Sequence, residues 1–177
     1  MTNKILITGP PRCGKSTLIS KIIEYFHKEK DFAIHGFLTP EVRKNGNRIG
    51  FDIVDVYSEK RSHLARAGNF KTEHRLGKYS VFIQEFDKYI EESLNLEGKR
   101  VNLVVIDEIG KMELFSHKFY NFIKDLFSLE IPILATIGLK LKHPIKNYLQ
   151  HLPGVQIFNL NRQNFSVIYK KTISLIV

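Results

Sequence analysis

The sequence predicts an α/β domain in which a mostly parallel sheet carries helices on both faces. Short β-branched apolar runs alternate with longer segments whose apolar residues recur at helical spacing. The run 101–106 is apolar throughout, as expected of a strand buried on both faces. The 177 residues contain no internal repeat and no long linker, so we expect a single domain over residues 1–177.

The first half of the chain should contain two strands, a helix and an antiparallel hairpin. In chain order we expect a strand at 5–8, a helix at 16–29, a strand at 33–39, and hairpin strands at 41–43 and 48–54 around the turn Asn45-Gly46-Asn47. Residues 58–80 are polar, basic and weakly patterned. They fit an inserted loop or short-strand region and are a candidate lid.

The second half should alternate regularly between helices and strands. We expect a helix at 81–94, a strand at 101–106, a helix at 115–127, a strand at 131–137, a short helix after Pro144, a strand at 155–158 and a final helix from Asn161. This alternation is typical of parallel strands joined by helical crossovers.

The charge is strongly basic and unevenly distributed. The formal net charge is +9, no acidic residue follows Glu130, and the stretch 58–80 holds six Lys and Arg residues against two glutamates. Such surfaces attract polyanions, so a nucleotide or a nucleic acid is a suitable partner. A solvated lysine-rich surface without a partner fits the composition equally well.

Several classes of protein are disfavoured. No apolar run approaches the ~18 residues that cross a bilayer, and residues 1–4 lead into a strand-like segment without the features of a signal peptide. The single cysteine, Cys13, cannot form an internal disulfide, which favours a reducing compartment. We therefore expect a cytoplasmic protein with no membrane partner. The seven histidines lack zinc-ligand spacing.

The strongest motif lies directly after the first predicted strand. Gly9-Pro10-Pro11-Arg12-Cys13-Gly14-Lys15-Ser16, followed by Thr17, matches the phosphate-binding loop G-x-x-x-x-G-K-[ST] between a strand and a helix. The glycines let backbone N–H groups point at phosphate oxygens, and the helix N-terminus adds positive potential. We expect Lys15 to neutralise the β- and γ-phosphates and Ser16 to ligate Mg²⁺.

A second motif ends the apolar run 101–106. Asp107 and Glu108 follow it, and the carboxyl end of a parallel strand faces the same crevice as the phosphate loop. We expect Asp107 to hold Mg²⁺ with Ser16, usually through a water. Glu108 is the candidate base that orients the water attacking the γ-phosphorus, which favours hydrolysis. Alternatively, Glu108 caps a helix or pairs with Lys111.

The segment Asp107-Glu108-Ile109-Gly110-Lys111-Met112-Glu113-Leu114-Phe115 resembles the signature of the small nucleoside-triphosphatases of thermophilic prokaryotes, a family that includes the animal cancer-related nucleoside-triphosphatase. Further similar segments are 9–17, 36–43, 48–52, 64–68, 75–81 and 135–137, so the resemblance covers nearly the whole chain. It implies a RecA-like P-loop fold and slow, Mg²⁺-dependent hydrolysis of several nucleoside triphosphates with loose base selectivity.

The resemblance also bears on nucleotide binding outside the two motifs. It places Gly110 and Asn164 among the nucleotide-binding residues. The family usually has Gly and a small apolar residue at the positions of Arg12 and Cys13. It also has an arginine where this chain has Phe165, so a base or sugar contact there would pass to a stacking Phe165 or to Arg162. Asn161 fits a simple helix N-cap.

Phosphoryl transfer is accelerated by a well-placed arginine, and three are candidates. Arg43 is the first choice, because it follows a strand and precedes the Asn-Gly turn. Arg66 and Arg75 lie in the basic insertion and could close over the nucleotide; Lys111 is a further candidate. Each is otherwise an ordinary surface residue. Thr136 ends a strand and would sense the γ-phosphate or cap the next turn.

Three functions remain open from the sequence. A monomeric nucleoside-triphosphate phosphohydrolase is favoured by Glu108 and by the lack of an obvious acceptor domain. A small kinase acting on a nucleoside, nucleotide or other hydroxyl compound is second, with residues 58–80 as the lid. A nucleotide-gated RNA-binding regulator is third, because no RNA-binding motif accompanies the basic stretches.

Overall fold

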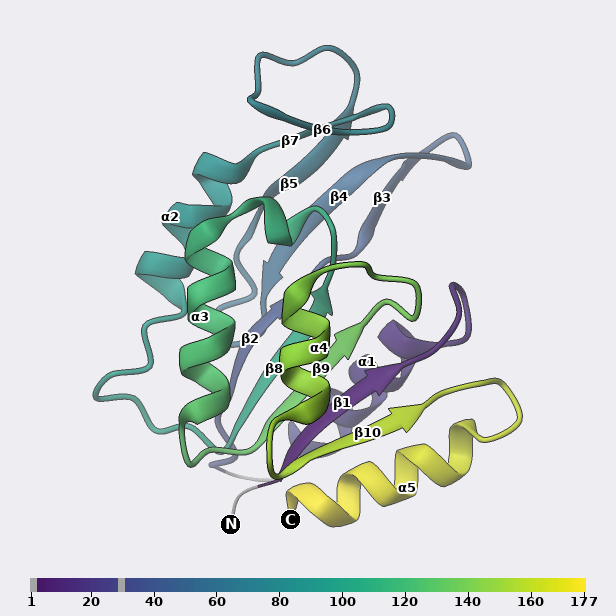
Figure 1. Ribbon diagram of the computed structural model, residues 1–177, viewed down its shortest axis with the longest axis vertical. Coiled ribbons are helices and arrows are strands. Elements are labelled where there is room, and N and C mark those ends of the chain that lie inside the picture. Colours follow the sequence, from purple (N-terminus) through teal and green to yellow (C-terminus); the bar gives the residue numbers. More distant parts are fainter. Residues whose placement is uncertain (1–2, 29–30) are drawn as a thin grey trace.

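The computed structural model describes residues 3–28 and 31–177. Within these residues, ten strands form one sheet in the order β10-β1-β9-β8-β2-β4-β5-β7-β6, with β3 paired to β4 (Figure 1). Helices cover both faces, as the sequence predicts. The strands of one half of this sheet are parallel, and those of the other half are antiparallel.

The parallel half contains the strands that carry the two motifs. It comprises β1 (Lys4–Thr8), β2 (Ile34–Leu38), β8 (Leu103–Ile109), β9 (Ile133–Ile137) and β10 (Val155–Asn159). Strand β9 lies between β1 and β8, so the loop after β1 and the acids at the end of β8 open at the same sheet edge, two strands apart.

The antiparallel half is larger than the single hairpin that the sequence predicts. It comprises β3 (Glu41–Lys44), β4 (Asn47–Asp55), β5 (Arg61–Ala67), β6 (His74–Leu76) and β7 (Tyr79–Val81). The expectation of a mostly parallel sheet is therefore wrong: the sheet is mixed. Residues 58–80 are largely short strands that extend the sheet. Their polar, weakly alternating pattern reflects their place near its edge.

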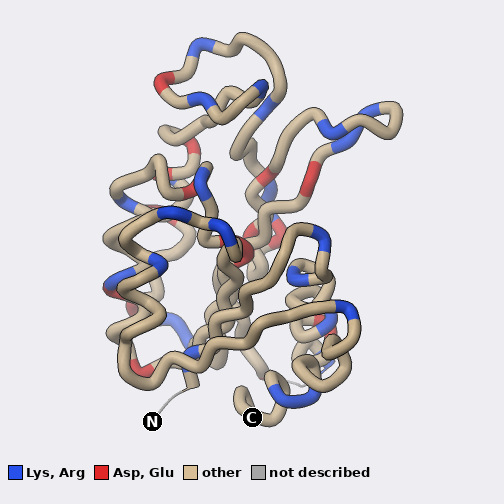
Figure 2. Tube along the Cα trace, turned by 45° about the vertical axis from the view of Figure 1, so that its right-hand side comes forward, with Lys and Arg blue, Asp and Glu red and all other residues tan. Residues whose placement is uncertain are grey.

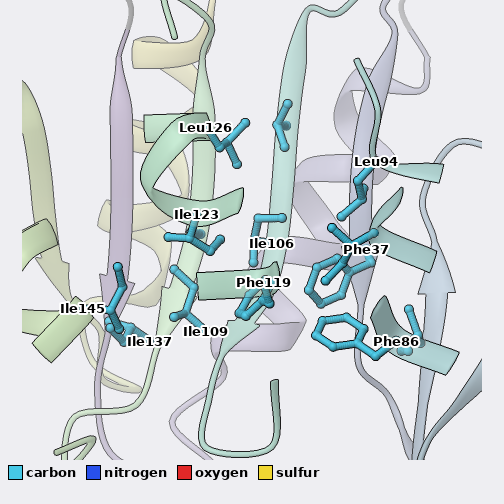
Figure 3. Close-up of a cluster of buried hydrophobic side chains, with 14 of the residues drawn as sticks. Phe37, Phe86, Leu94, Ile106, Ile109, Phe119, Ile123, Leu126, Ile137 and Ile145 are labelled. Atoms are coloured by element: carbon cyan, nitrogen blue, oxygen red, sulfur yellow. The ribbon is translucent and has the colours of Figure 1, made fainter. Parts of the chain in front are cut away.

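Two hydrophobic cores fill the two sides of the sheet. One side packs against α1 (Lys15–Phe26) and α5 (Phe165–Ile176), and the other against α2 (Ile83–Ser93), α3 (His117–Ser128) and α4 (Pro144–His151). On the second side Phe37, Phe86 and Phe119 meet edge to face and tilted, with ring centroids 5.2–5.8 Å apart (Figure 3). These aromatic contacts join α2 and α3 to strand β2.

The predicted elements form, with shifts at several ends. Helix α1 ends at Phe26, and Glu29, where the sequence placed its end, lies outside the described residues. Helix α2 begins at Ile83 because residues 79–81 pair with β5 and β6 as β7. Helix α5 begins at Phe165 rather than at Asn161. These ends are set by tertiary pairing and by a local turn, neither of which periodicity detects.

No helix in the described part of the chain is both long and apolar enough to cross a membrane. Lys and Arg positions occur in the β5–β7 region at the top of the molecule and also near α5 at the bottom (Figure 2). Two of the basic residues in the β5 region, Arg61 and Arg66, pair with the buried Asp52. Part of the positive charge of this region is thus neutralised by an acidic residue of the same sheet.

Candidate active site

The phosphate-binding loop joins β1 to α1 and depends on two glycines. Gly9 has a φ of 156°, and a Cβ there would lie 2.4 Å from the carbonyl oxygen of Leu160. Gly14 has a φ of 107° and is the N-cap of α1. The Lys15 ammonium donates to the carbonyl oxygens of Gly9 (3.1 Å) and Pro10 (3.3 Å). The lysine ammonium therefore lies against the backbone of the loop.

Asp107 lies near the end of β8, only 4% exposed. Thr136 Oγ1 on β9 donates a hydrogen bond to Asp107 Oδ1 at 2.5 Å. Burial raises the pKa of Asp107, while hydrogen bonds from Thr136 and Ser16 and the charge of Lys15 oppose that rise. The Ser16 hydroxyl and the Asp107 carboxylate line the same cavity, and both are oxygen donors of the kind that Mg²⁺ prefers.

Glu108 follows Asp107 through a cis peptide bond and is partly buried. Burial, and next the negative charge of Asp107, raise its pKa, whereas Lys15 lowers it. The ion pairs found among the described residues do not include a Glu108–Lys111 pair. Glu108 is therefore a carboxylate beside Lys15 and Asp107, and its raised pKa makes it a better proton acceptor.

Glu113 contributes a third carboxyl group, which no motif in the sequence indicates. Glu113 begins the short 3₁₀ helix η1 (Glu113–Phe115) and is 4% exposed. Burial, followed by the charge of Glu108, raises its pKa to about 8. A Cβ at Gly110 would lie 2.6 Å from Glu113 Oε2 and 2.9 Å from Glu108 Oε1. The glutamates thus flank Gly110, which has no room for a side chain.

One cavity of about 820 Å³ brings the two motifs together. Its lining includes Lys15, Ser16, Asp107, Glu108 and Glu113. The remaining lining residues are Gly9, Pro11, Arg12, Gly14, Thr17, Ser20, Leu38, Thr39, Pro40, Glu41, Arg48, Phe51, Leu76, Gly110, Lys111, Met112, Gly138, Leu139, Lys140 and Leu141. The phosphate loop and the strand-end acids therefore share a site, as their positions on β1 and β8 predict.

Two arginines line this cavity, Arg12 from the phosphate loop and Arg48 from β4, and Arg48 is not among the arginines that the sequence singles out. Arg43 instead pairs with Glu41 and donates to the carbonyl oxygen of Gly46, outside the cavity lining. Arg66 pairs with Asp52, and Arg75 donates to Gly68 and Ser80. None of these three candidates lines the cavity, because each is held by a partner in the antiparallel half. Lys111 does line it.

The segment before α5 also differs from the sequence-based expectation. Asn161 Oδ1 accepts from the backbone N–H groups of Gln163 and Asn164, so it caps a turn rather than the helix. Asn164 Oδ1 accepts from the N–H of Asn161, and its Nδ2 donates to the carbonyl of Asn159. The Phe165 ring lies beside the phosphate loop, 3.4 Å from where a Gly14 Cβ would be.

Comparison with known proteins assigns the chain to a family. The sequence model of a family described as NTPase matches residues 4–173, nearly the whole chain. The chain belongs to the NTPase family. It is 38% identical to the nucleoside-triphosphatase THEP1 of Thermotoga petrophila, over 95% of this chain and 89% of that protein. It is 35% identical to the cancer-related nucleoside-triphosphatase homolog of Mus musculus, over 93% and 91%.

A solved structure of a family member has the same fold. The crystal structure of THEP1 from Aquifex aeolicus superposes with a TM-score of 0.83 and 33% identity, covering 98% of each chain. The family that the signature around Asp107 resembles is thus the family that the comparisons find. The mixed sheet belongs to the shared fold, because the superposition includes nearly all of both chains.

Proposed function

We propose that this protein hydrolyses nucleoside triphosphates, as Mg²⁺ complexes, to the diphosphate and phosphate. The observation that carries the proposal is one cavity lined by Lys15, Ser16, Asp107 and Glu108, with Thr136 bonded behind Asp107. These are the groups that phosphate binding, metal binding and water activation require. The relatives in the NTPase family are named nucleoside-triphosphatases, which supports the same reaction here.

The triphosphate would bind along the loop between β1 and α1. The backbone N–H groups of this loop and the N-terminal end of α1 favour an anion. Lys15 lies close enough to the loop to move from the carbonyls of Gly9 and Pro10 to the β- and γ-phosphate oxygens. We assign the loop residues Gly9 to Thr17 to phosphate binding.

Magnesium fits the residues present. Ser16 and Asp107 supply a hydroxyl and a carboxylate in the same cavity, and the hydrogen bond from Thr136 orients that carboxylate. Bound there, the ion would offset the negative charge of the phosphates. A hard cation with oxygen ligands suits this pair better than a thiolate- or imidazole-preferring metal.

Glu108 would act on the water that attacks the γ-phosphorus. The water oxygen forms the new P–O bond, its proton passes to the Glu108 carboxylate, and the bond from the γ-phosphorus to the bridging oxygen breaks. A pKa raised by burial and by Asp107 brings Glu108 closer to the operating pH, which improves a general base. Lys15 stabilises the charge on the transferred group.

Loose base selectivity is supported by the segment before α5. Both polar groups of the Asn164 side chain are engaged within its own turn, so they are not free to recognise a base. Phe165, beside Gly14, offers a ring that stacks on any base. We therefore propose ATP, GTP, CTP and UTP as substrates. A cytoplasmic monomer also belongs to this proposal.

The experiment that tests the proposal is phosphate release from the four nucleotides with Mg²⁺, with Lys15→Ala as the control. Turnover of several nucleotides that is lost in Lys15→Ala would support it. Phosphate release that is equal in wild type and Lys15→Ala would contradict it, because the activity would not come from this loop. Tight nucleotide binding without phosphate release would also contradict it and would favour transfer to an acceptor.

A further inference from the structure

Arg12, in the phosphate loop, has an unfavourable backbone conformation for an arginine. Its φ is 61°, in the left-handed region that favours glycine, and the other residues of the loop with positive φ are its two glycines. Non-glycine residues held in this region cost stability and are frequent at functional sites. Three residues outside the cavity share the conformation, so φ alone assigns no function to Arg12: Asp31, Asn45 and Glu59. Its place in the cavity is the second observation.

Arg12 also has a charge without a partner inside the protein. Two arginines line the cavity, Arg12 and Arg48. Arg48 donates hydrogen bonds to Glu41 and Tyr79. Among residues 3–28 and 31–177, no carboxylate or carbonyl group accepts a hydrogen bond from the exposed Arg12 side chain. Of these two guanidinium groups, the one on the phosphate loop is therefore available to an anionic ligand.

The cavity is the phosphate end of the proposed nucleotide site. Its lining includes Lys15 and Glu108 but not Phe165, the ring proposed to stack on the base. Arg12 enters this cavity from the same loop as Lys15. Two lysines, Lys111 and Lys140, line the cavity as well, but an ammonium is a point charge. The planar guanidinium donates two parallel hydrogen bonds to phosphate oxygens, so Arg12 is best suited to the γ-phosphoryl group.

We propose that Arg12 is a catalytic residue that donates hydrogen bonds to the γ-phosphoryl oxygens in the transition state. The water oxygen bonds to the γ-phosphorus, its proton passes to Glu108, and the bond to the bridging oxygen breaks. Negative charge builds up on the oxygens around the breaking bond, and a guanidinium in the loop offsets it. This inference rests on the proposed function and adds a cation that the chain supplies to its own site.

The test is Arg12→Gly, which removes the side chain and suits the backbone. We expect its urea midpoint to equal or exceed that of wild type, because glycine relieves the strain. Single-turnover phosphate release from ATP with Mg²⁺ should fall about ten- to a hundredfold, as expected for losing a hydrogen bond to a charged group. KM should change less than kcat, because the contact forms mainly in the transition state.

Two further variants show which property of Arg12 matters. Arg12→Lys should recover only part of the rate, because it restores the charge without the planar fork. Glu59→Gly is the matched control for a glycine at positive φ. Glu59 has a φ of 58° and lies on the turn between β4 and β5, outside the cavity lining. This control should keep the wild-type rate of phosphate release.

A binding measurement separates transition-state stabilisation from general phosphate binding. ADP with Mg²⁺ and aluminium fluoride imitates the γ-phosphoryl group during transfer, whereas ADP alone lacks that group. Arg12→Gly should lower the affinity for the aluminium fluoride complex about tenfold or more and leave the affinity for ADP unchanged. Equal losses for the two ligands would overturn the proposal, because Arg12 would then bind the remaining phosphates. Unchanged binding of both ligands would also overturn it.

Arg12→Asn is a second variant in case Arg12→Gly does not fold, because asparagine also adopts the left-handed conformation. It should show the same losses. Phosphate release that is equal in wild type and in these variants would overturn this inference and leave the hydrolase proposal intact. A wild type that releases no phosphate would contradict the hydrolase proposal. The aluminium fluoride measurement would then still decide the role of Arg12, since it needs no turnover.

Discussion

Thr136 donates a 2.5 Å hydrogen bond to the carboxylate of Asp107, and both side chains are buried. The two residues lie on the neighbouring parallel strands β9 and β8, 29 residues apart in the chain. The bond holds one carboxylate oxygen of Asp107 toward β9, while Ser16, in the first turn of α1, lowers the pKa of the same carboxyl group. Thr136 therefore positions the proposed Mg²⁺ ligand without being a ligand itself.

Thr136→Val should weaken the binding of Mg²⁺ at the proposed site. Valine keeps the shape of threonine but leaves Asp107 without its donor, and a hydrogen bond to a charged group contributes about 1.5–3 kcal/mol. We expect the Mg²⁺ concentration for half-maximal phosphate release to rise about tenfold or more. Thr136→Ser, which keeps the hydroxyl, is the control and should behave as wild type. An unaltered Mg²⁺ titration in the valine variant would mean that the Thr136 side chain contributes packing in the core and does not position Asp107 for Mg²⁺.

Glu108→Gln should abolish most turnover and keep nucleotide binding. Glutamine has nearly the same shape but cannot accept the proton, and general base catalysis contributes roughly 10²–10⁴ in rate. Single-turnover hydrolysis and equilibrium binding of a fluorescent triphosphate separate the two effects. Glu92→Gln, an exposed change on α2, is the matched control. A Glu108→Gln enzyme as fast as wild type would assign water activation to another group.

Gly110→Ala should displace the glutamates on both sides of it. The new Cβ would lie 2.6 Å from Glu113 Oε2 and 2.9 Å from Glu108 Oε1, so a carboxyl group must move. We expect a loss of about 1–3 kcal/mol in the free energy of unfolding, measured in urea, together with reduced turnover. Gly138→Ala is the matched control, since a Cβ there has 3.9 Å of room in the same cavity. Equal effects of the two changes would contradict this account.

Glu113→Gln should change how stability depends on pH. The pKa of Glu113 is about 8 in the fold against an ordinary value of 4.5, so the folded state holds this proton more tightly than the unfolded chain. The stabilisation is full below pH 4.5, declines as pH rises, and is lost above about pH 8. Glutamine stays neutral, so the variant should gain stability relative to wild type as pH rises from 5 to 8.

Urea denaturation across that pH range tests the Glu113 prediction. The exposed Glu97→Gln is run alongside as a matched control for removing one glutamate. Parallel stability curves for wild type and Glu113→Gln would show that this carboxyl does not change its proton affinity on folding. Curves that separate with rising pH, the variant becoming relatively more stable, would agree with its burial beside Glu108.

The sequence predicted the parallel half of the sheet well and the antiparallel half poorly. Strands β1, β8 and β9 each contain an uninterrupted apolar run of three or four residues, and such runs identify buried parallel strands. Strand β5 is mostly polar and basic, and β6 and β7 have only three residues each, so the sequence of this region resembles a loop. Their pairing with β4 and with one another supplies the order that local pattern does not show.

The β3–β4 hairpin shows a similar limit, because Arg48 and not Arg43 lines the cavity. Arg43 and Arg48 are partners across the β3–β4 hairpin, and both bond to Glu41, so sequence position alone does not separate them. Arg48 is selected by Tyr79, 31 residues further along, whose hydroxyl and ring hold its guanidinium. That contact exists only because β7 joins the same sheet.

By itself the sequence determined the family, and it predicted that the loop from Gly9 to Thr17 and the acids Asp107 and Glu108 lie together at one edge of the sheet. Each depends on residues adjacent in the chain, where spacing fixes backbone shape and the end of a strand fixes the direction of the site. Only the tertiary structure decided that Arg48 lines the cavity, that Glu113 is buried beside Glu108, and that Asn164 is engaged in its own turn. Exposure, proton affinity and free hydrogen-bonding groups depend on what packs around a side chain, and for Arg48 and Glu113 those neighbours come from other elements of the fold.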